Sequence, residues 1–131
     1  MKKEIDIENQ RIVAMMEEGD RFTLDTDIGI TVVLNVLENG LCPSVYNPAV
    51  KCFWEGQLVA HFNIEDSNGD SMATFILSNH NTNFRDVYRV DENEIYVRAT
   101  GRYDPGKSRD EAAIEIEISH IVELNALILN E

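Results

Sequence analysis

The sequence predicts a mainly β protein, a small antiparallel Greek-key barrel preceded by an N-terminal α-helix. Two observations support this fold class. Four segments between residues 57 and 124 alternate apolar and polar side chains, as half-buried antiparallel strands do. Turn-forming residues separate these segments, which gives the order strand, tight hairpin, strand, longer link, strand, turn and final strand. The four predicted strands are Gln57–Ile64, Ser71–Leu77, Glu94–Tyr103 and Ala112–Leu124.

Two polar segments and one glycine indicate how these strands are joined. Glu65–Asp70 reads Glu-Asp-Ser-Asn-Gly-Asp, which is typical of a tight hairpin turn. Asp104–Arg109 reads Asp-Pro-Gly-Lys-Ser-Arg and predicts the turn into the last strand. Gly101 interrupts the third strand, where a barrel strand must bend sharply.

The first half of the chain is expected to hold the helix and the remaining strands. Apolar residues of Ile5–Glu18 gather on one side of a helix, and Gly19 follows as a stop signal. Phe22–Thr26 alternates like a strand, and Ile28–Leu37 is rich in β-branched residues. Prolines make Glu38–Glu55 irregular. One domain therefore comprises a helical extension (1–20), a barrel (21–124) and a tail (125–131).

Composition restricts where the protein is expected to work. No apolar run reaches membrane-spanning length, and the N-terminus lacks the apolar stretch of a signal peptide. We therefore expect a cytoplasmic protein with no membrane partner. In that reducing compartment Cys42 and Cys52 are expected to be free thiols, although two cysteines ten residues apart could also form one bridge.

The chain is strongly acidic, with 11 Lys and Arg against 24 Asp and Glu and a net charge of −13. The ends carry most of the excess, and residues 110–131 contain no basic residue. A field of this sign repels phosphate backbones. It is explained either by solubility alone or by a surface that meets a basic partner.

The predicted third strand presents Arg98 and Arg102 on its polar face, beside Tyr96. Such a stripe could contact phosphates and stack a base. The last strand, however, presents Glu115 and Glu117, and hairpin pairing would place these acids beside the arginines. Cross-strand ion pairs are therefore the favoured interpretation of the four charges.

No motif predicts catalysis, a metal or a cofactor. The three histidines, His61, His80 and His120, fall in different elements, without neighbours at zinc-ligand spacing. Neither cysteine stands in a recognisable nucleophile motif, and no glycine-rich phosphate loop is present. We expect a non-enzymatic protein. An enzyme with an unrecognised site is a third alternative, after the two binding functions given below.

The strand and turn pattern resembles an OB-fold of the kind found in anticodon-binding and replication proteins. Residues 56–76 resemble the second and third strands of that family, 95–102 the fourth and 113–124 the fifth, with 30–38 as the first. The resemblance covers about three quarters of the 131 residues and is a pattern of strands and turns.

The resemblance implies a ligand surface on the second and third strands, between two flanking loops. The strand residues would be Val59, His61, Asn63, Ala73 and Phe75. The loop residues would be Tyr46, Lys51, Phe53 and Trp54 in Asn39–Gly56, with Lys107 and Arg109 in Asp104–Arg109.

Two binding functions follow as hypotheses. In the first, acidic surfaces that include Glu115 and Glu117 engage a protein partner with a basic surface, as an adaptor or as a charge-mimic inhibitor of a nucleic-acid enzyme. In the second, the loop aromatics bind single-stranded nucleic acid. The apolar tail at 125–130 could in addition join two copies of the chain.

Overall fold

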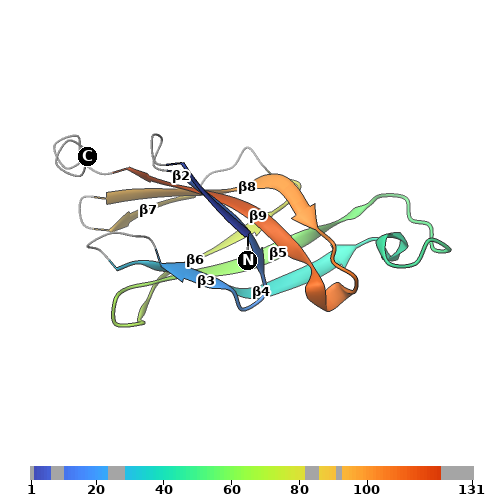
Figure 1. Ribbon diagram of the computed structural model, residues 1–131, viewed down its shortest axis with the longest axis horizontal. Coiled ribbons are helices and arrows are strands. Elements are labelled where there is room, and N and C mark those ends of the chain that lie inside the picture. The colour runs from blue at the N-terminus through green and yellow to red at the C-terminus, as the bar shows by residue number, and fades with distance from the viewer. Residues whose placement is uncertain (1, 7–10, 24–28, 82–85, 91–92, 122–131) are drawn as a thin grey trace.

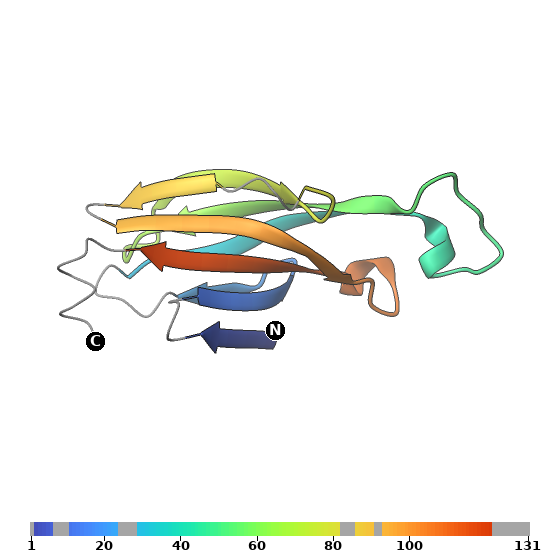
Figure 2. The same ribbon diagram turned by 90° about the horizontal axis from the view of Figure 1, so that it is seen from above.

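The protein is mainly β and consists of two antiparallel sheets. The computed structural model describes residues 2–6, 11–23, 29–81, 86–90 and 93–121. Sheet A has the order β1-β2-β9-β8-β7 and sheet B the order β3-β4-β5-β6. In Figure 1 sheet A lies mostly above sheet B, and Figure 2 shows the same strands from above. The strands of sheet A are β1 (Lys2–Asp6), β2 (Arg11–Glu17), β7 (Asp86–Val90), β8 (Asn93–Asp104) and β9 (Ala113–Ile121). Those of sheet B are β3 (Arg21–Thr23), β4 (Thr31–Leu41), β5 (Gly56–Glu65) and β6 (Ser71–Ser78).

The core lies between the two sheets and is built from the inward-facing residues of each. In β5 every second residue is buried, and Phe62 at its centre is 1% exposed. The Phe62 ring stacks on Phe75 of β6 with 5.1 Å between ring centroids. Sheet A contributes three buried isoleucines from β9: Ile114, Ile116 and Ile118. This alternation confirms the predicted strands at 57–64, 71–77, 94–103 and 112–121; the rest of the last one lies outside the described residues.

The predicted N-terminal helix is wrong. Most of Ile5–Glu18 belongs to β1 and β2, and these strands pair with each other. In β2 the buried Ala14 and Met16 pair with Ile116 and Ile114 of β9. Each second residue therefore faces the core, which is the period of a strand. Pairing with β9 outweighs the weak helical periodicity, because tertiary context routinely overrides a local preference.

The expected closed barrel is not confirmed. Sheets A and B meet after β2, where Gly19 N–H donates to Leu34 O at 2.7 Å and Leu34 N–H donates to Asp20 O at 2.9 Å. Beyond this crossing the strands remain in two separate sheets. The described residues also form the 3₁₀ turns η1 (Pro43–Val45) and η2 (Arg109–Glu111).

The predicted turns and the predicted bend are confirmed. In the 65–70 turn, Asp66 Oδ1 accepts the backbone N–H groups of Asn68 and Asp70 at 2.8 and 3.0 Å. At Gly101 the register of β8 against β9 shifts between Ala99 and Tyr103, and Gly101 has φ +95°. This left-handed conformation suits glycine, so the bend is encoded by that residue.

Candidate interaction surface

A disulfide closes the loop between β4 and β5. Cys42 and Cys52 are bonded, with 6.0 Å between their Cα atoms. The expectation of free thiols is therefore wrong: the chain turns at η1 and returns Cys52 to the start of the loop. Residues 42–55, called the disulfide loop below, project beyond the two sheets in both Figure 1 and Figure 2.

The base of the disulfide loop is held by backbone geometry. Cys42 N–H donates to Glu55 O at 2.8 Å, directly above the last pair of the β4–β5 ladder, Leu41 and Gly56. Gly56 has φ +80°, and a Cβ there would lie 2.0 Å from Gly40 O. Only glycine fits this close approach of the β4 and β5 backbones. Gly56 therefore allows the two strands to lie close together at the base of the loop.

Tyr46 ties the disulfide loop to the turn between β8 and β9. Its hydroxyl donates to Pro105 O at 2.7 Å and accepts from Asn39 Nδ2 at 2.8 Å. The Arg109 guanidinium lies 5.7 Å from the centre of the Tyr46 ring and donates to Asn39 O at 3.0 Å. The two loops that the resemblance pairs are thus brought together. Tyr46 and Arg109 use their polar groups within this junction.

Two neighbouring aromatic side chains of the disulfide loop are exposed. Phe53 has an exposed fraction of 110% and Trp54 of 60%. The Trp54 ring is supported on one side by His80, with 5.7 Å between ring centroids. His80 is itself held by a hydrogen bond between Nε2 and the carbonyl oxygen of Gly56. The loop therefore presents apolar rings to solvent from a braced position.

The strand residues of the predicted ligand surface divide between two faces. Val59, His61 and Asn63 are half-buried and lie on the outer face of sheet B. Ala73 and Phe75 pair with Ile64 and Phe62 of β5, which face the core. Their placement on the ligand surface is therefore wrong. Thr74 and Ile76 take the outer positions of β6 instead, because they pair with Asn63 and His61.

The acidic pair of β9 lies on the outer face of sheet A. Glu117 Oε2 accepts from Arg98 Nη2 at 2.9 Å, so this predicted cross-strand pair is confirmed. Glu115 Oε1 instead accepts from Thr100 Oγ1 at 2.7 Å. Only 8% of the Glu117 side chain is exposed, and Arg98 Nε is buried without a hydrogen-bond partner. Glu117 is therefore part of a largely buried polar group rather than an open surface charge.

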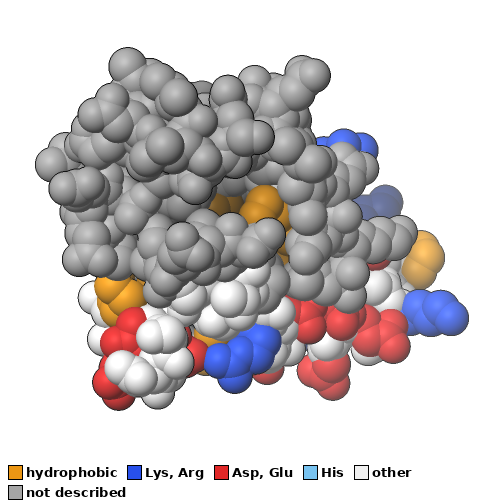
Figure 3. Space-filling view, turned by 60° about the vertical axis from the view of Figure 1, so that its left-hand side comes forward, with side chains coloured by type: hydrophobic (Ala, Val, Ile, Leu, Met, Phe, Trp, Pro, Cys, Tyr) orange, Lys and Arg blue, Asp and Glu red, His pale blue; other side chains and the backbone are white. Residues whose placement is uncertain are grey.

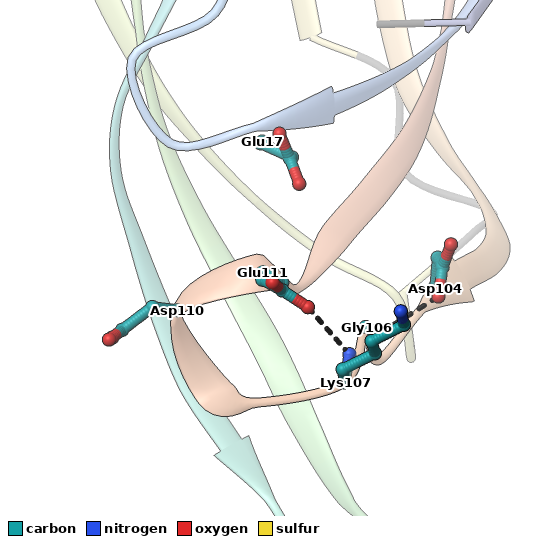
Figure 4. Close-up of a pocket in the computed structure, with 6 residues that line it drawn as sticks. All are labelled: Glu17, Asp104, Gly106, Lys107, Asp110 and Glu111. Carbon is teal, nitrogen blue, oxygen red and sulfur yellow. Dashed lines mark hydrogen bonds between the residues drawn. The ribbon is translucent and has the colours of Figure 1, made fainter.

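Lys107 lies in an acidic hollow rather than in a basic groove. Four carboxylate residues line the hollow with Gly106 and Lys107, as Figure 4 shows: Glu17, Asp104, Asp110 and Glu111. Glu111 Oε2 accepts the backbone N–H of Lys107 at 2.9 Å, and Asp104 Oδ1 accepts that of Gly106 at 2.9 Å. The surroundings of Lys107 are therefore acidic, which weakens its predicted role in phosphate binding.

The sequence interpretation missed several residues of this region. His80, Val36 and Ile76 lie on or beside the surfaces described above. A signal existed for Ile76, since β6 has apolar residues at both odd and even positions. No signal marked His80, whose contact with Trp54 depends on the loop conformation. Among the described residues no cluster of His, Cys, Asp and Glu has the arrangement of a metal site.

Three comparisons with known proteins, against family models, curated proteins and solved structures, found no match for the chain. In the part of the chain that the structure describes, no helix has the length and apolar character needed to cross a bilayer.

Proposed function

We propose that the protein is a non-enzymatic binding module that engages a protein partner through the disulfide loop. The observation that carries this proposal is the exposure of Phe53 and Trp54 next to each other, at 110% and 60%. Aromatic side chains dominate the binding energy of many protein interfaces, where they fill pockets on the partner. A loop that is braced before binding also loses less conformational entropy when it binds.

The bracing of the loop is extensive. The disulfide joins residues 42 and 52, Tyr46 is hydrogen-bonded to Pro105, and Trp54 contacts His80. Each contact restricts a different part of the loop, so the aromatic pair is presented in a defined position. This arrangement is typical of an anchor that inserts into a preformed pocket.

The charge of the molecule supports a basic partner. With a net charge of −13, the protein attracts a positively charged surface over a distance of about 10 Å at moderate ionic strength. On the face seen in Figure 3, acidic side chains lie among basic ones in the part that is not grey. An adaptor or a charge-mimic inhibitor of a nucleic-acid enzyme fits this character. Long-range attraction would then raise the association rate, and the aromatic anchor would slow dissociation.

Affinity capture with matched variants tests the proposal. Immobilised wild-type protein and F53S/W54S are exposed to an extract of the source organism, and retained proteins are quantified by mass spectrometry. We expect the double variant to lose a specific partner by at least about tenfold, since anchor residues are often worth 2 kcal/mol or more. V45S, in the same loop at 39% exposure, is the control and should retain it. Equal recovery by wild type and F53S/W54S would refute the proposal.

A second candidate function is binding of single-stranded nucleic acid, and the observation that favours it is the open Trp54 ring. Bases stack on such rings in proteins that resemble OB-folds, and Lys51 in the same loop could contact a phosphate. The acids around Lys107 and the overall charge oppose this function. A labelled oligothymidylate decides between the two functions: binding that weakens steeply with salt and is lost in F53S/W54S would favour nucleic acid.

A further inference from the structure

The outer face of sheet B carries a second group of exposed apolar side chains. Val36 of β4 is 47% exposed, and Met72 and Ile76 of β6 are 41% and 58% exposed. Val36 and Ile76 both pair with His61 of β5, so the three residues form one row across three strands. Val59 lies two residues from His61 on the same face and is half-buried. Val36, Val59, Met72 and Ile76 are called the apolar stripe below.

The exposed large apolar residues of the described chain occur in two places only. Six such residues are exposed: Val36, Met72 and Ile76 in the apolar stripe, and Val45, Phe53 and Trp54 in the disulfide loop. Single exposed apolar residues are common on protein surfaces, but contiguous ones mark interaction sites. The inner face of sheet B is covered by sheet A, whereas no described element forms a third layer over the outer face. The stripe is therefore open to a partner.

One exposed acidic side chain, Glu38, lies at the rim of the apolar stripe. Glu38 pairs with Val59 across the strands, and 61% of its side chain is exposed. His61 Nε2 is hydrogen-bonded to Glu38 Oε2 at 2.8 Å. Arg21 on this sheet forms a salt bridge with Glu65, with 2.7 Å between Nη2 and Oε1. The Glu38 carboxylate and the net charge of −13 therefore favour a partner that combines apolar residues with positive charge.

We propose that the apolar stripe docks a basic amphipathic α-helix of a protein partner. Val36 and Ile76 are separated by two strand spacings, about 10 Å, which matches the width of one helix. Helices commonly cover apolar sheet faces in layered proteins, and the apolar face of an amphipathic helix presents residues three and four apart. Lysines at the borders of that face would meet Glu38. A second copy of the chain does not fit this role, because two molecules of charge −13 repel each other.

Defined peptide probes test this proposal without knowledge of the natural partner. One probe is an 18-residue helical peptide with leucines three and four apart and lysines elsewhere, and its counterpart carries glutamates in place of the lysines. Fluorescence anisotropy of the labelled peptides measures binding. The lysine peptide should bind with 1:1 saturation, and the glutamate peptide should not bind. V36S/I76S should lower the affinity for the lysine peptide at least tenfold, and E38Q should lower that affinity severalfold.

Two control variants separate this site from general charge attraction and from the disulfide loop. D110N removes an exposed carboxylate outside sheet B, and V45S removes an exposed apolar side chain of the disulfide loop. Both should bind the lysine peptide as wild type does. The His61 ring resonances should also shift when that peptide is added, which reports contact independently of any substitution. The substituted side chains are exposed, and circular dichroism checks that each variant is folded.

Several outcomes would overturn the proposal. The lysine and glutamate peptides could bind equally well, or V36S/I76S could bind the lysine peptide as tightly as wild type does. V45S could also lose as much affinity for the lysine peptide as V36S/I76S. A concentration-dependent dimer that V36S/I76S abolishes, observed by analytical ultracentrifugation, would instead assign the stripe to a second copy. None of these results depends on Phe53 or Trp54, so the proposed function of the disulfide loop stands or falls separately.

Discussion

Tyr46 donates its phenolic hydrogen to the carbonyl oxygen of Pro105 at 2.7 Å, across 59 positions of the chain. This bond joins the disulfide loop to the turn between β8 and β9, and therefore couples a loop of sheet B to a turn of sheet A. Asn39 donates to the same hydroxyl, so the oxygen acts as donor and acceptor at once. The position of the exposed aromatic pair depends on this junction.

Replacing Tyr46 by phenylalanine is expected to loosen the disulfide loop with a modest loss of stability. The ring and its contact with Arg109 remain, but the hydrogen bonds to Pro105 and Asn39 disappear. We expect the free energy of unfolding to fall by about 1 kcal/mol. Trp54, the single tryptophan, should show lower fluorescence anisotropy and stronger quenching by iodide. Unchanged anisotropy would mean that Tyr46 does not control the loop.

Reduction of the Cys42–Cys52 disulfide is expected to destabilise the protein by about 2–3 kcal/mol, the loop-closure entropy of a crosslink of this length. The measurement is urea denaturation with and without dithiothreitol. C42S/C52S is the control, because its denaturation midpoint should not respond to reductant. A wild-type denaturation midpoint that is the same with and without reductant would show that the disulfide contributes no stability.

Substitution of Gly101 by valine is expected to destabilise the fold by at least about 1 kcal/mol. Gly101 has φ +95°, where a β-branched side chain is strained, and the bend of β8 depends on it. R102V is a suitable control, because Arg102 is an exposed neighbour in the same strand and valine favours strands. Chemical denaturation of both variants gives the comparison. A G101V midpoint equal to that of R102V would mean that β8 does not need the bend.

The strands of the second half could be predicted because burial there has a simple period. In β5 and β9 one face is apolar and the other polar, so alternation alone identifies both the strand and its inner side. In β2 the residues Val13 and Met15 are also apolar, which hides the alternation of the buried Ala14 and Met16 and favours a helical interpretation. The strand β7 lies in the link between Leu77 and Glu94, for which the sequence predicts no strand.

The same ambiguity explains the error in the candidate site. β6 carries Met72 and Ile76 on one face and Phe75 on the other, so its sequence does not distinguish the outer face from the inner one. Register decides the faces, and the register depends on the shift between Ile64 and Glu65 at the hairpin. The disulfide was equally out of reach, because it requires the path of residues 42–52 in space. In contrast, the place of Trp54 in an irregular segment could be predicted from the prolines of Glu38–Glu55.

Glu115 and Glu117 of β9 are expected to differ in their contributions to stability, although both are acids on the same face of one strand. Glu117 is largely buried against Arg98, whose Nε already lacks a partner. Glu117→Gln weakens a charge-assisted bond in a poorly solvated place and should lower the free energy of unfolding by about 1–3 kcal/mol. Glu115 is half-buried and accepts from Thr100, and glutamine can accept the same bond. Glu115→Gln should therefore change stability by less than about 0.5 kcal/mol.

Urea denaturation of the two single variants at neutral pH measures this difference, and Arg98→Met tests its origin. If the Arg98–Glu117 pair is the cause, adding Glu117→Gln to Arg98→Met should have a smaller effect than in the wild-type background, because the interaction is already absent. Equal effects in both backgrounds would assign the stability to another contact of Glu117. Equal and small effects of both single glutamate variants would mean that Glu117 is solvated. It would then be available, as the sequence first suggested, to a basic partner.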